Sequence, residues 1–268
     1  METEPATSYS DLRFVKHCHP PTLRPARADR APVPGSGNEA NVQANASLSN
    51  LALILAHRLR GLVLGIEGYT DLLIDSLHDR EQRDLALRIL ESTVQIERVL
   101  ADLQRYGRPV IPVPYRVRLR DVIEHLFVAL DEQDLERVQF ELQGLGELEL
   151  VADPVLLRQA LIVLLQNALE ATRQGGSVTF RIVRDLSGES VRFEVHNEGW
   201  IDLERAEEVV FAPFFTTKAH NLGVGLTMAR RIAEVHGGTL RLAVNSATEG
   251  TCFVLTLPSG VERRDDTG

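Results

Sequence analysis

The sequence predicts an α+β fold in which a two-helix hairpin precedes a layered α/β sandwich. Between residues 46 and 107, apolar side chains recur at alternating steps of four and three, whereas residues 117–260 mix helical periods with short alternating runs. The first pattern is the 3.5-residue seam of coiled coils and four-helix bundles. In the second, strands mix with helices without a regular β–α–β alternation, which favours a layered sandwich over a doubly wound sheet.

Two amphipathic helices account for the first pattern. Their seam positions are Leu55, Leu59, Leu62, Ile66, Tyr69 and Leu73 in one helix and Leu85, Ile89, Ser92, Ile96, Val99, Leu103 and Tyr106 in the other. A polar break over residues 76–80 joins the two helices. Because a lone helical hairpin cannot bury both of its faces, we expect two copies to pack as a homodimeric four-helix bundle. Packing of the hairpin on the chain's own second domain is the alternative.

Segments of different composition flank the two predicted domains. Residues 1–45 are rich in Pro, Ala, Ser, Asn and Arg and show no sustained period, which predicts a disordered tail. The proline-containing residues 108–116 end the second helix and are typical of a stiff linker. Residues 261–268 are predicted to form a polar tail.

The second domain, residues 117–260, is expected to alternate between helices and strands in an irregular order. Asp153 and Pro154 supply an N-cap followed by proline at the first helical position. The predicted helices cover 119–130, 154–172 and 222–236, and the predicted strands cover 138–142, 147–151, 177–183, 191–196, 239–244 and 251–257. We expect the last two strands to pair through a turn at 245–250.

Composition excludes several classes of function. The net charge of −9 disfavours binding to a nucleic-acid backbone, which needs a clustered excess of Lys and Arg. No apolar run reaches the roughly 20 residues that cross a bilayer, and the N-terminus lacks the pattern of a secretion signal. The two cysteines are far apart and predict no disulfide framework. We therefore expect a soluble cytoplasmic protein with no nucleic-acid and no membrane partner.

Four segments of the second domain carry a specific resemblance. Residues Leu161–Ala171 resemble the N box, Glu194–Ile201 the D or G1 box, Phe211–Lys218 the F box, and Asn221–Leu226 the G2 box of the histidine-kinase ATP-binding domain. Their order and spacing also agree with that domain, which belongs to the wider family shared with gyrase, Hsp90 and MutL. The resemblance extends through the helical hairpin to the dimerisation and phosphotransfer domain of sensor histidine kinases. It implies binding of ATP and Mg²⁺.

The resemblance also assigns roles to individual residues. It implies that the Asn167 amide oxygen holds Mg²⁺, an ion that takes few protein oxygens together with waters and phosphates. Asn197 stands where the family most often has an aspartate that accepts a hydrogen bond from the adenine amino group, and an amide oxygen can accept the same bond. The other positions implied in cofactor binding are Glu170, Gly199, Ile201, Phe214, Thr217, Lys218, Leu222, Gly223, Gly225 and Leu226.

Two features of this set have a direct physical reason. Gly223 and Gly225 precede a predicted helix, where backbone N–H groups can meet phosphate. Lys218 supplies a positive point charge near the phosphates. The sequence contains no Gly-x-x-x-x-Gly-Lys-Ser/Thr loop, so no P-loop is expected.

In the hairpin, residues Ala56–Leu73 resemble the H box, and the resemblance implies that His57 is the phosphoacceptor. His57 lies two positions after the seam residue Leu55 and should face solvent. A neutral imidazole is a competent nitrogen nucleophile. The expected partners are the receiver domain of a response regulator, which takes the phosphoryl group on an aspartate, and a sensory or activating protein.

Four residues depart from the family pattern. Arg58 replaces the acidic residue that usually follows the histidine, and a guanidinium cannot accept the imidazole proton. Gly61 and Leu62 replace an Asn or Thr and a proline, and Val163 replaces the first asparagine of the N box. These departures predict a weak autokinase without phosphatase activity that hydrolyses ATP poorly.

Two other functions remain open from the sequence. Arg58 and Gly61 favour a catalytically degenerate histidine-phosphotransfer or pseudokinase scaffold. The well-kept F and G2 boxes argue against this function, because a pure scaffold does not need a phosphate-binding site. The other is a serine kinase of the anti-sigma-factor type, which would have the same ATP-binding fold. Such a kinase does not need a long helical hairpin that carries a histidine at the H-box position.

Overall fold

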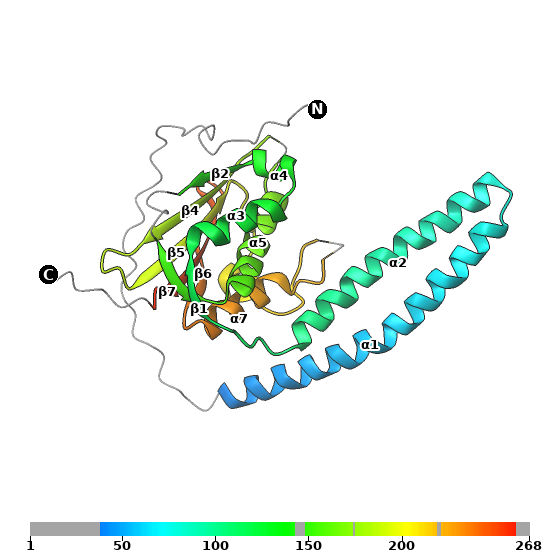
Figure 1. Ribbon diagram of the computed structural model, residues 1–268, viewed down its shortest axis with the longest axis horizontal. Helices are drawn as coiled ribbons and strands as arrows, with labels where there is room; N and C mark the ends of the chain where they lie inside the picture. Colours follow the sequence, from blue (N-terminus) through cyan, green and yellow to red (C-terminus); the bar gives the residue numbers. More distant parts are fainter. Residues whose placement is uncertain (1–37, 143–147, 174, 219–220, 261–268) are drawn as a thin grey trace, which may run out of the picture. The chain divides into compact units, whose positions relative to one another are not determined.

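The computed structural model describes residues 38–142, 148–173, 175–218 and 221–260, with side chains from residue 48 onward (Figure 1). The predicted polar tail at 261–268 lies outside the described residues, as does most of the tail predicted for 1–45. Among the helices in the described ranges, none combines the length and the apolar character needed to cross a membrane.

Two helices form the hairpin, α1 (Asn38–Ser76) and α2 (Arg80–Gly107). Asp79 begins α2, because its side chain accepts a hydrogen bond of 3.0 Å from the backbone N–H of Glu81. The hairpin starts at Asn38 and not at residue 46, so the predicted tail boundary is wrong by eight residues. Residues 38–46 contain Ala, Glu and Gln but neither Gly nor Pro, and these helix formers continue the helix toward its N-terminus.

The contact between α1 and α2 is a narrow stripe of mostly small side chains. Its buried members repeat every seven residues on both helices: Ala56, Val63 and Thr70 on α1, and Ala86, Thr93 and Leu100 on α2. The predicted seam lies on another face of the hairpin. In a single chain its α1 members are exposed, from 42% for Leu59 to 77% for Tyr69. One hairpin therefore leaves most of its apolar side chains in solvent.

A five-stranded sheet and three longer helices form the main part of the second domain. The sheet has the order β2 (Val138–Glu141), β4 (Val178–Arg184), β5 (Ser190–Asn197), β7 (Gly250–Pro258) and β6 (Thr239–Ser246). Only β2 and β4 run parallel to each other, and the other neighbours are antiparallel. The pairing of β6 with β7 confirms the hairpin predicted there, although β6 extends two residues further than expected.

The helices α3 (Leu119–Ala129), α5 (Pro154–Ala171) and α7 (Gly225–Val235) cover one face of this sheet (Figure 1). Their apolar faces pack on the sheet in one continuous core that includes Leu126, Leu161, Ile232, Phe180, Phe193 and Phe253. This arrangement confirms the predicted α/β sandwich. Asp153 caps α5 by accepting hydrogen bonds from the backbone N–H groups of Val155 and Leu156 at 3.0 and 3.1 Å.

Sequence reasoning missed three short elements. They are β1 (Tyr115–Arg118), α4 (Glu132–Glu136) and α6 (Ala206–Val210). With four or five residues each, they are too short to show a period. β1 pairs antiparallel with β3 (Glu149–Ala152) in a separate two-stranded sheet, so the second domain begins inside the predicted linker.

The last turn of α2 does not belong to the exposed seam. Tyr106 is fully buried and packs near Val224 and Met228. The guanidinium of Arg231 lies 4.3 Å from the centroid of the Tyr106 ring and donates a hydrogen bond of 2.9 Å to the Tyr106 carbonyl oxygen. The seam prediction is therefore wrong at Tyr106, because the Tyr106 ring packs against α7 and does not belong to the exposed seam.

Candidate nucleotide-binding site

A cavity of about 680 Å³ opens at one end of the sheet, and most of the predicted site residues line it. This volume suits a nucleotide-sized ligand. Eleven of the twelve positions expected to bind the cofactor are on its wall: Asn167, Glu170, Asn197, Gly199, Ile201, Thr217, Lys218, Leu222, Gly223, Gly225 and Leu226. They come from α5, the end of β5 and its following loop, the segments on both sides of residues 219–220, and the start of α7.

Phe214 is the exception, because its neighbour Phe215 lines the cavity instead. Phe214 has a φ of 64°, in the left-handed region that non-glycine residues rarely adopt. Its ring lies 5.1 Å from that of Tyr106, centroid to centroid. Phe214 and Phe215 therefore have different surroundings, and the contact of Phe214 with the nucleotide stays a prediction.

At one end of the cavity, a lysine ammonium occupies a cluster of oxygen atoms. Lys218 Nζ donates to Asn167 Oδ1 at 3.0 Å and makes a short ion pair with Glu170 Oε2. Asn221 Nδ2 donates to the same Glu170 oxygen at 3.3 Å. An amide oxygen and a carboxylate are ligands that Mg²⁺ accepts together with phosphates and waters. The oxygens of Asn167 and Glu170 therefore fit a cation, which Lys218 supplies here.

At the other end, Asn197 is the last residue of β5 and is almost fully buried. Its Nδ2 atom donates to the carbonyl oxygen of Gly199 at 3.3 Å. This bond fixes which end of the amide faces the following loop and leaves Oδ1 as the acceptor for a ligand. The requirement for glycine at 199 is steric, because a Cβ atom there would lie 2.5 Å from the carbonyl oxygen of Ala171.

The start of α7 offers backbone donors to the cavity. Val224 is its N-cap residue and makes no side-chain capping hydrogen bond, so its own side chain satisfies none of the first N–H groups of the helix. Gly223, with a φ of 73°, would place a Cβ atom 2.3 Å from the carbonyl oxygen of Phe215. A helix N-terminus with free N–H groups is a site for phosphate.

Sequence reasoning missed other cavity residues, among them Trp200 and Thr251. Trp200 follows Gly199 in the same loop, and a tryptophan there has no local pattern that would single it out. Thr251 pairs in register with Asn197 on the neighbouring strand. Its position follows from strand pairing, which could have identified it once β5 and β7 were known to be neighbours.

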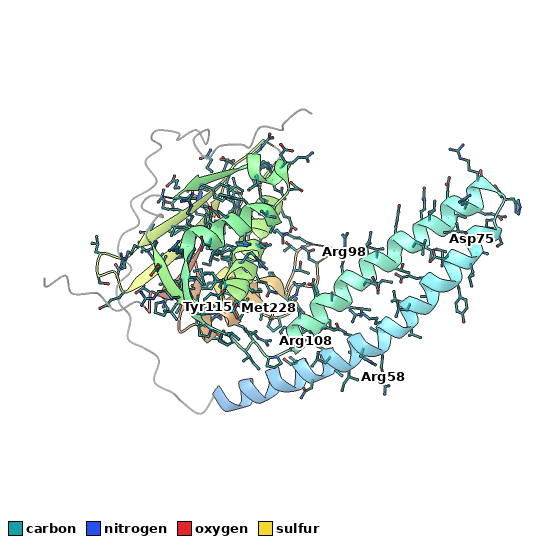
Figure 2. All side chains as sticks on the ribbon, viewed as in Figure 1. Arg58, Asp75, Arg98, Arg108, Tyr115 and Met228 are labelled. Atoms are coloured by element: carbon teal, nitrogen blue, oxygen red, sulfur yellow. The ribbon has the colours of Figure 1, made fainter. Side chains whose placement is uncertain are left out.

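The predicted phosphoacceptor lies apart from this cavity. His57 is exposed on α1, as its offset from the seam predicts, and it is not among the cavity residues. Figure 2 shows Arg58 projecting from α1 on the side away from α2. A Cβ atom added to Gly61 would meet nothing within 4 Å, so packing does not require glycine there. Val163, by contrast, lines the cavity and faces Gly225.

Comparison with known proteins agrees with this geometry. Residues 152–261 match the family described as histidine kinase-, DNA gyrase B- and HSP90-like ATPase. Sensor histidine kinase ZraS of Escherichia coli strain K12 is 29% identical over 225 residues, which cover 83% of this chain and 48% of ZraS. Residues 152–261 therefore form an ATPase domain of the histidine-kinase type, and the chain is similar to sensor histidine kinases over most of its length. It spans about half the length of the curated relatives it matches.

Two solved structures share the fold. Full-length ShkA in complex with AMPPNP has a TM-score of 0.61 at 20% identity, and the alignment covers 80% of this chain and 47% of ShkA. Histidine kinase ThkA in complex with the response regulator protein TrrA has a TM-score of 0.57 at 26% identity, with 83% and 65% of the two chains covered. Both alignments extend beyond the ATPase domain, and the family match supports ATP binding.

Proposed function

We propose that this protein is a two-component protein-histidine kinase that binds Mg-ATP, phosphorylates His57 and passes the phosphoryl group to an aspartate of a response regulator. The observation that carries the proposal is the convergence of the four motif segments on one cavity. The hairpin of α1 and α2, residues 38–107, would serve as the dimerisation and phosphotransfer domain, and residues 115–260 as the ATP-binding domain.

In the proposed site, the sheet end holds the base and the α7 N-terminus holds the phosphates. Asn197 Oδ1 would accept from the adenine amino group, and the N–H groups around Gly223 to Gly225 would donate to the triphosphate. Bound Mg²⁺ would neutralise phosphate charge, with Asn167 and Glu170 as its protein ligands. Lys218, which now contacts both of these residues, would move its ammonium to a phosphate oxygen.

Phosphoryl transfer would join a His57 ring nitrogen to the γ-phosphorus and break the bond between this phosphorus and the bridging oxygen of ADP. The imidazole loses its N–H proton in the process, and without a side-chain base this proton goes to solvent water. Arg58 cannot take this proton, because a guanidinium is a permanent cation without an acceptor. General-base assistance is worth about 10²–10⁴ in rate, so we propose that autophosphorylation is slow. The same side chain can attract the incoming phosphate.

We further propose a homodimer formed through the hairpin. The support is the exposed apolar seam of α1 and α2, including Leu62 at 66% and Tyr69 at 77% exposure. A second copy would bury both seams in a four-helix bundle. In this arrangement His57 stays outside the bundle core, where a γ-phosphate or a receiver aspartate can reach it.

The response regulator is proposed as the partner on the strength of the family and of the exposed His57. Gly61 offers no side chain to position a water for receiver dephosphorylation, which supports the absence of phosphatase activity. A sensory or activating partner would supply the input.

The test is incubation of the purified protein with Mg²⁺ and γ-labelled ATP. We expect slow incorporation of acid-labile label in the wild type and in His125→Ala, which removes another exposed histidine, but none in His57→Ala. Fast labelling would contradict the weak-kinase proposal, and equal labelling of His57→Ala would contradict the phosphoacceptor.

A phosphotransfer or pseudokinase scaffold is the second candidate, favoured by Arg58 beside His57. It predicts that the wild type binds ATP without label but accepts a phosphoryl group from a phosphorylated receiver domain. Labelling from ATP would exclude it.

A further inference from the structure

A three-residue polar row crosses the sheet at the base-binding end of the cavity. Asn197 on β5 pairs in register with Thr251 on β7, and Thr251 pairs with Asn245 on β6. Thr251 Oγ1 donates to Asn245 Oδ1 at 3.3 Å. The two asparagines thus stand at opposite ends of one row, with the buried threonine between them.

Both ends of this row hold the loop 198–201. Asn197 Nδ2 donates to the carbonyl oxygen of Gly199 at 3.3 Å. Asn245 contacts Ile201 with both halves of its amide, because Oδ1 accepts from the Ile201 N–H at 2.8 Å and Nδ2 donates to the Ile201 carbonyl oxygen at 3.0 Å. A two-point contact of this kind fixes the orientation of the peptide as well as its distance from the strand.

A β-bulge places Asn245 in this row. Along β6, Leu240 and Leu242 pair with Leu255 and Phe253, and the register then shifts between Leu242 and Val244. With regular alternation, Val244 would follow on the core face of the sheet and Asn245 would face away from it. The extra residue reverses this parity and turns Asn245 toward the loop. Bulges beside functional sites commonly re-aim one side chain in this way.

We propose that Asn245 is a positioning residue for the base of the bound nucleotide, acting through Ile201 and the loop 198–201. The inference rests on the proposed binding of ATP. By holding the far end of the loop, Asn245 keeps Gly199 and Asn197 in the arrangement that leaves Asn197 Oδ1 free for adenine. It touches neither the α7 N-terminus nor the cluster around Lys218, so its effect is confined to the base.

The test compares Asn245→Ala with the wild type by titration calorimetry, using ADP and inorganic tripolyphosphate as ligands. We expect Asn245→Ala to lower the affinity for ADP about tenfold, the effect of one to two net hydrogen bonds. The affinity for tripolyphosphate should stay within twofold of the wild-type value. Arg241→Ala, on the outer face of the same strand, is the matched control and should bind both ligands like the wild type. A general structural role would weaken both ligands together, which would overturn the proposal.

The loop itself carries a probe, because Trp200 is the only tryptophan of the chain. In the nucleotide-free protein, acrylamide should quench Trp200 emission more strongly in Asn245→Ala than in the wild type. If Asn245→Ala does not fold, Thr251→Val serves as the second variant, since it replaces the hydroxyl that donates to Asn245 with a methyl group. Because Thr251 also lines the cavity, Trp200 quenching in the nucleotide-free protein is the deciding measurement for this variant. Thr251→Val should shift ADP affinity in the same direction by a smaller factor.

The outcomes separate this role from the proposed function. A wild type that binds neither ADP nor ATP would overturn the proposed function and, with it, the role in base binding. The positioning role alone would be overturned if the wild type and Asn245→Ala bind ADP equally well and show the same Trp200 quenching.

Discussion

The substitution Gly199→Ala tests the base end of the cavity most directly. A Cβ atom at this position would lie 2.5 Å from the carbonyl oxygen of Ala171 and 2.9 Å from Asn197 Nδ2, whereas ordinary contact begins at 3.4 Å. The Cβ atom would thus lie about 0.9 Å too close to the Ala171 carbonyl oxygen. This oxygen belongs to the backbone at the end of α5 and cannot rotate away as a side chain could. The loop must therefore shift by nearly an ångström and lose the hydrogen bond from Asn197 to Gly199.

The lost hydrogen bond and the displaced base contact together correspond to about 1.4–2.8 kcal/mol, a ten- to hundredfold loss of ATP affinity. Titration calorimetry with Mg-ATP measures this loss, and circular dichroism confirms that the variant is folded. Gly68→Ala is the matched control, because a Cβ at Gly68 on α1 meets nothing within 4 Å and should leave affinity unchanged. A folded Gly199→Ala protein with wild-type affinity would show that the nucleotide does not use this loop.

Four further perturbations have defined outcomes. Arg58→Glu should raise the rate of His57 labelling at least tenfold by supplying a proton acceptor, measured with γ-labelled ATP. Lys218→Ala should lower the affinity for ATP several-fold, as measured by calorimetry. The melting temperature should barely change, because the ion pair between Lys218 and Glu170 is partly exposed. Replacing both Leu62 and Tyr69 with glutamate should convert the proposed dimer to a monomer, as measured by light scattering. Burial alone would raise the pKa of Asp153, but backbone hydrogen bonds from Val113, Leu156 and Val155 lower this pKa overall. Asp153→Ala should therefore lower the free energy of unfolding in urea by about 1 kcal/mol near neutral pH. This difference from the wild type should disappear as the pH falls through the lowered pKa of Asp153.

Much of the site could be predicted because its residues belong to short local segments. Asn167 lies in an apolar helical run, Gly223 and Gly225 precede a helix, and Asn197 ends a strand. Each segment forms one wall of the cavity, so identifying the segments was enough to bring their residues together. The same locality explains the correct order of helices and strands in the second domain.

The missed features depend on contacts between distant segments. Asn245 reaches Ile201 only because of the bulge in β6, and a period-two pattern predicts the opposite face. Tyr106 continues the seam spacing of α2 but is buried against Arg231, far along the chain. Phe214 and Phe215 are chemically alike, and only the positive φ of Phe214 decides which of them lines the cavity.

The narrow stripe of small side chains between α1 and α2 has a consequence for how this protein unfolds. Ala56, Thr70, Ala86 and Thr93 bury little apolar area, so the two helices of one chain gain little free energy from each other. In the proposed dimer, most of the hairpin's stabilisation would come from the second copy, and its melting temperature would then rise with protein concentration. The ATP-binding domain has its own core and should melt at a temperature independent of concentration. Heating at several dilutions would therefore give one transition that moves and one that stays in place.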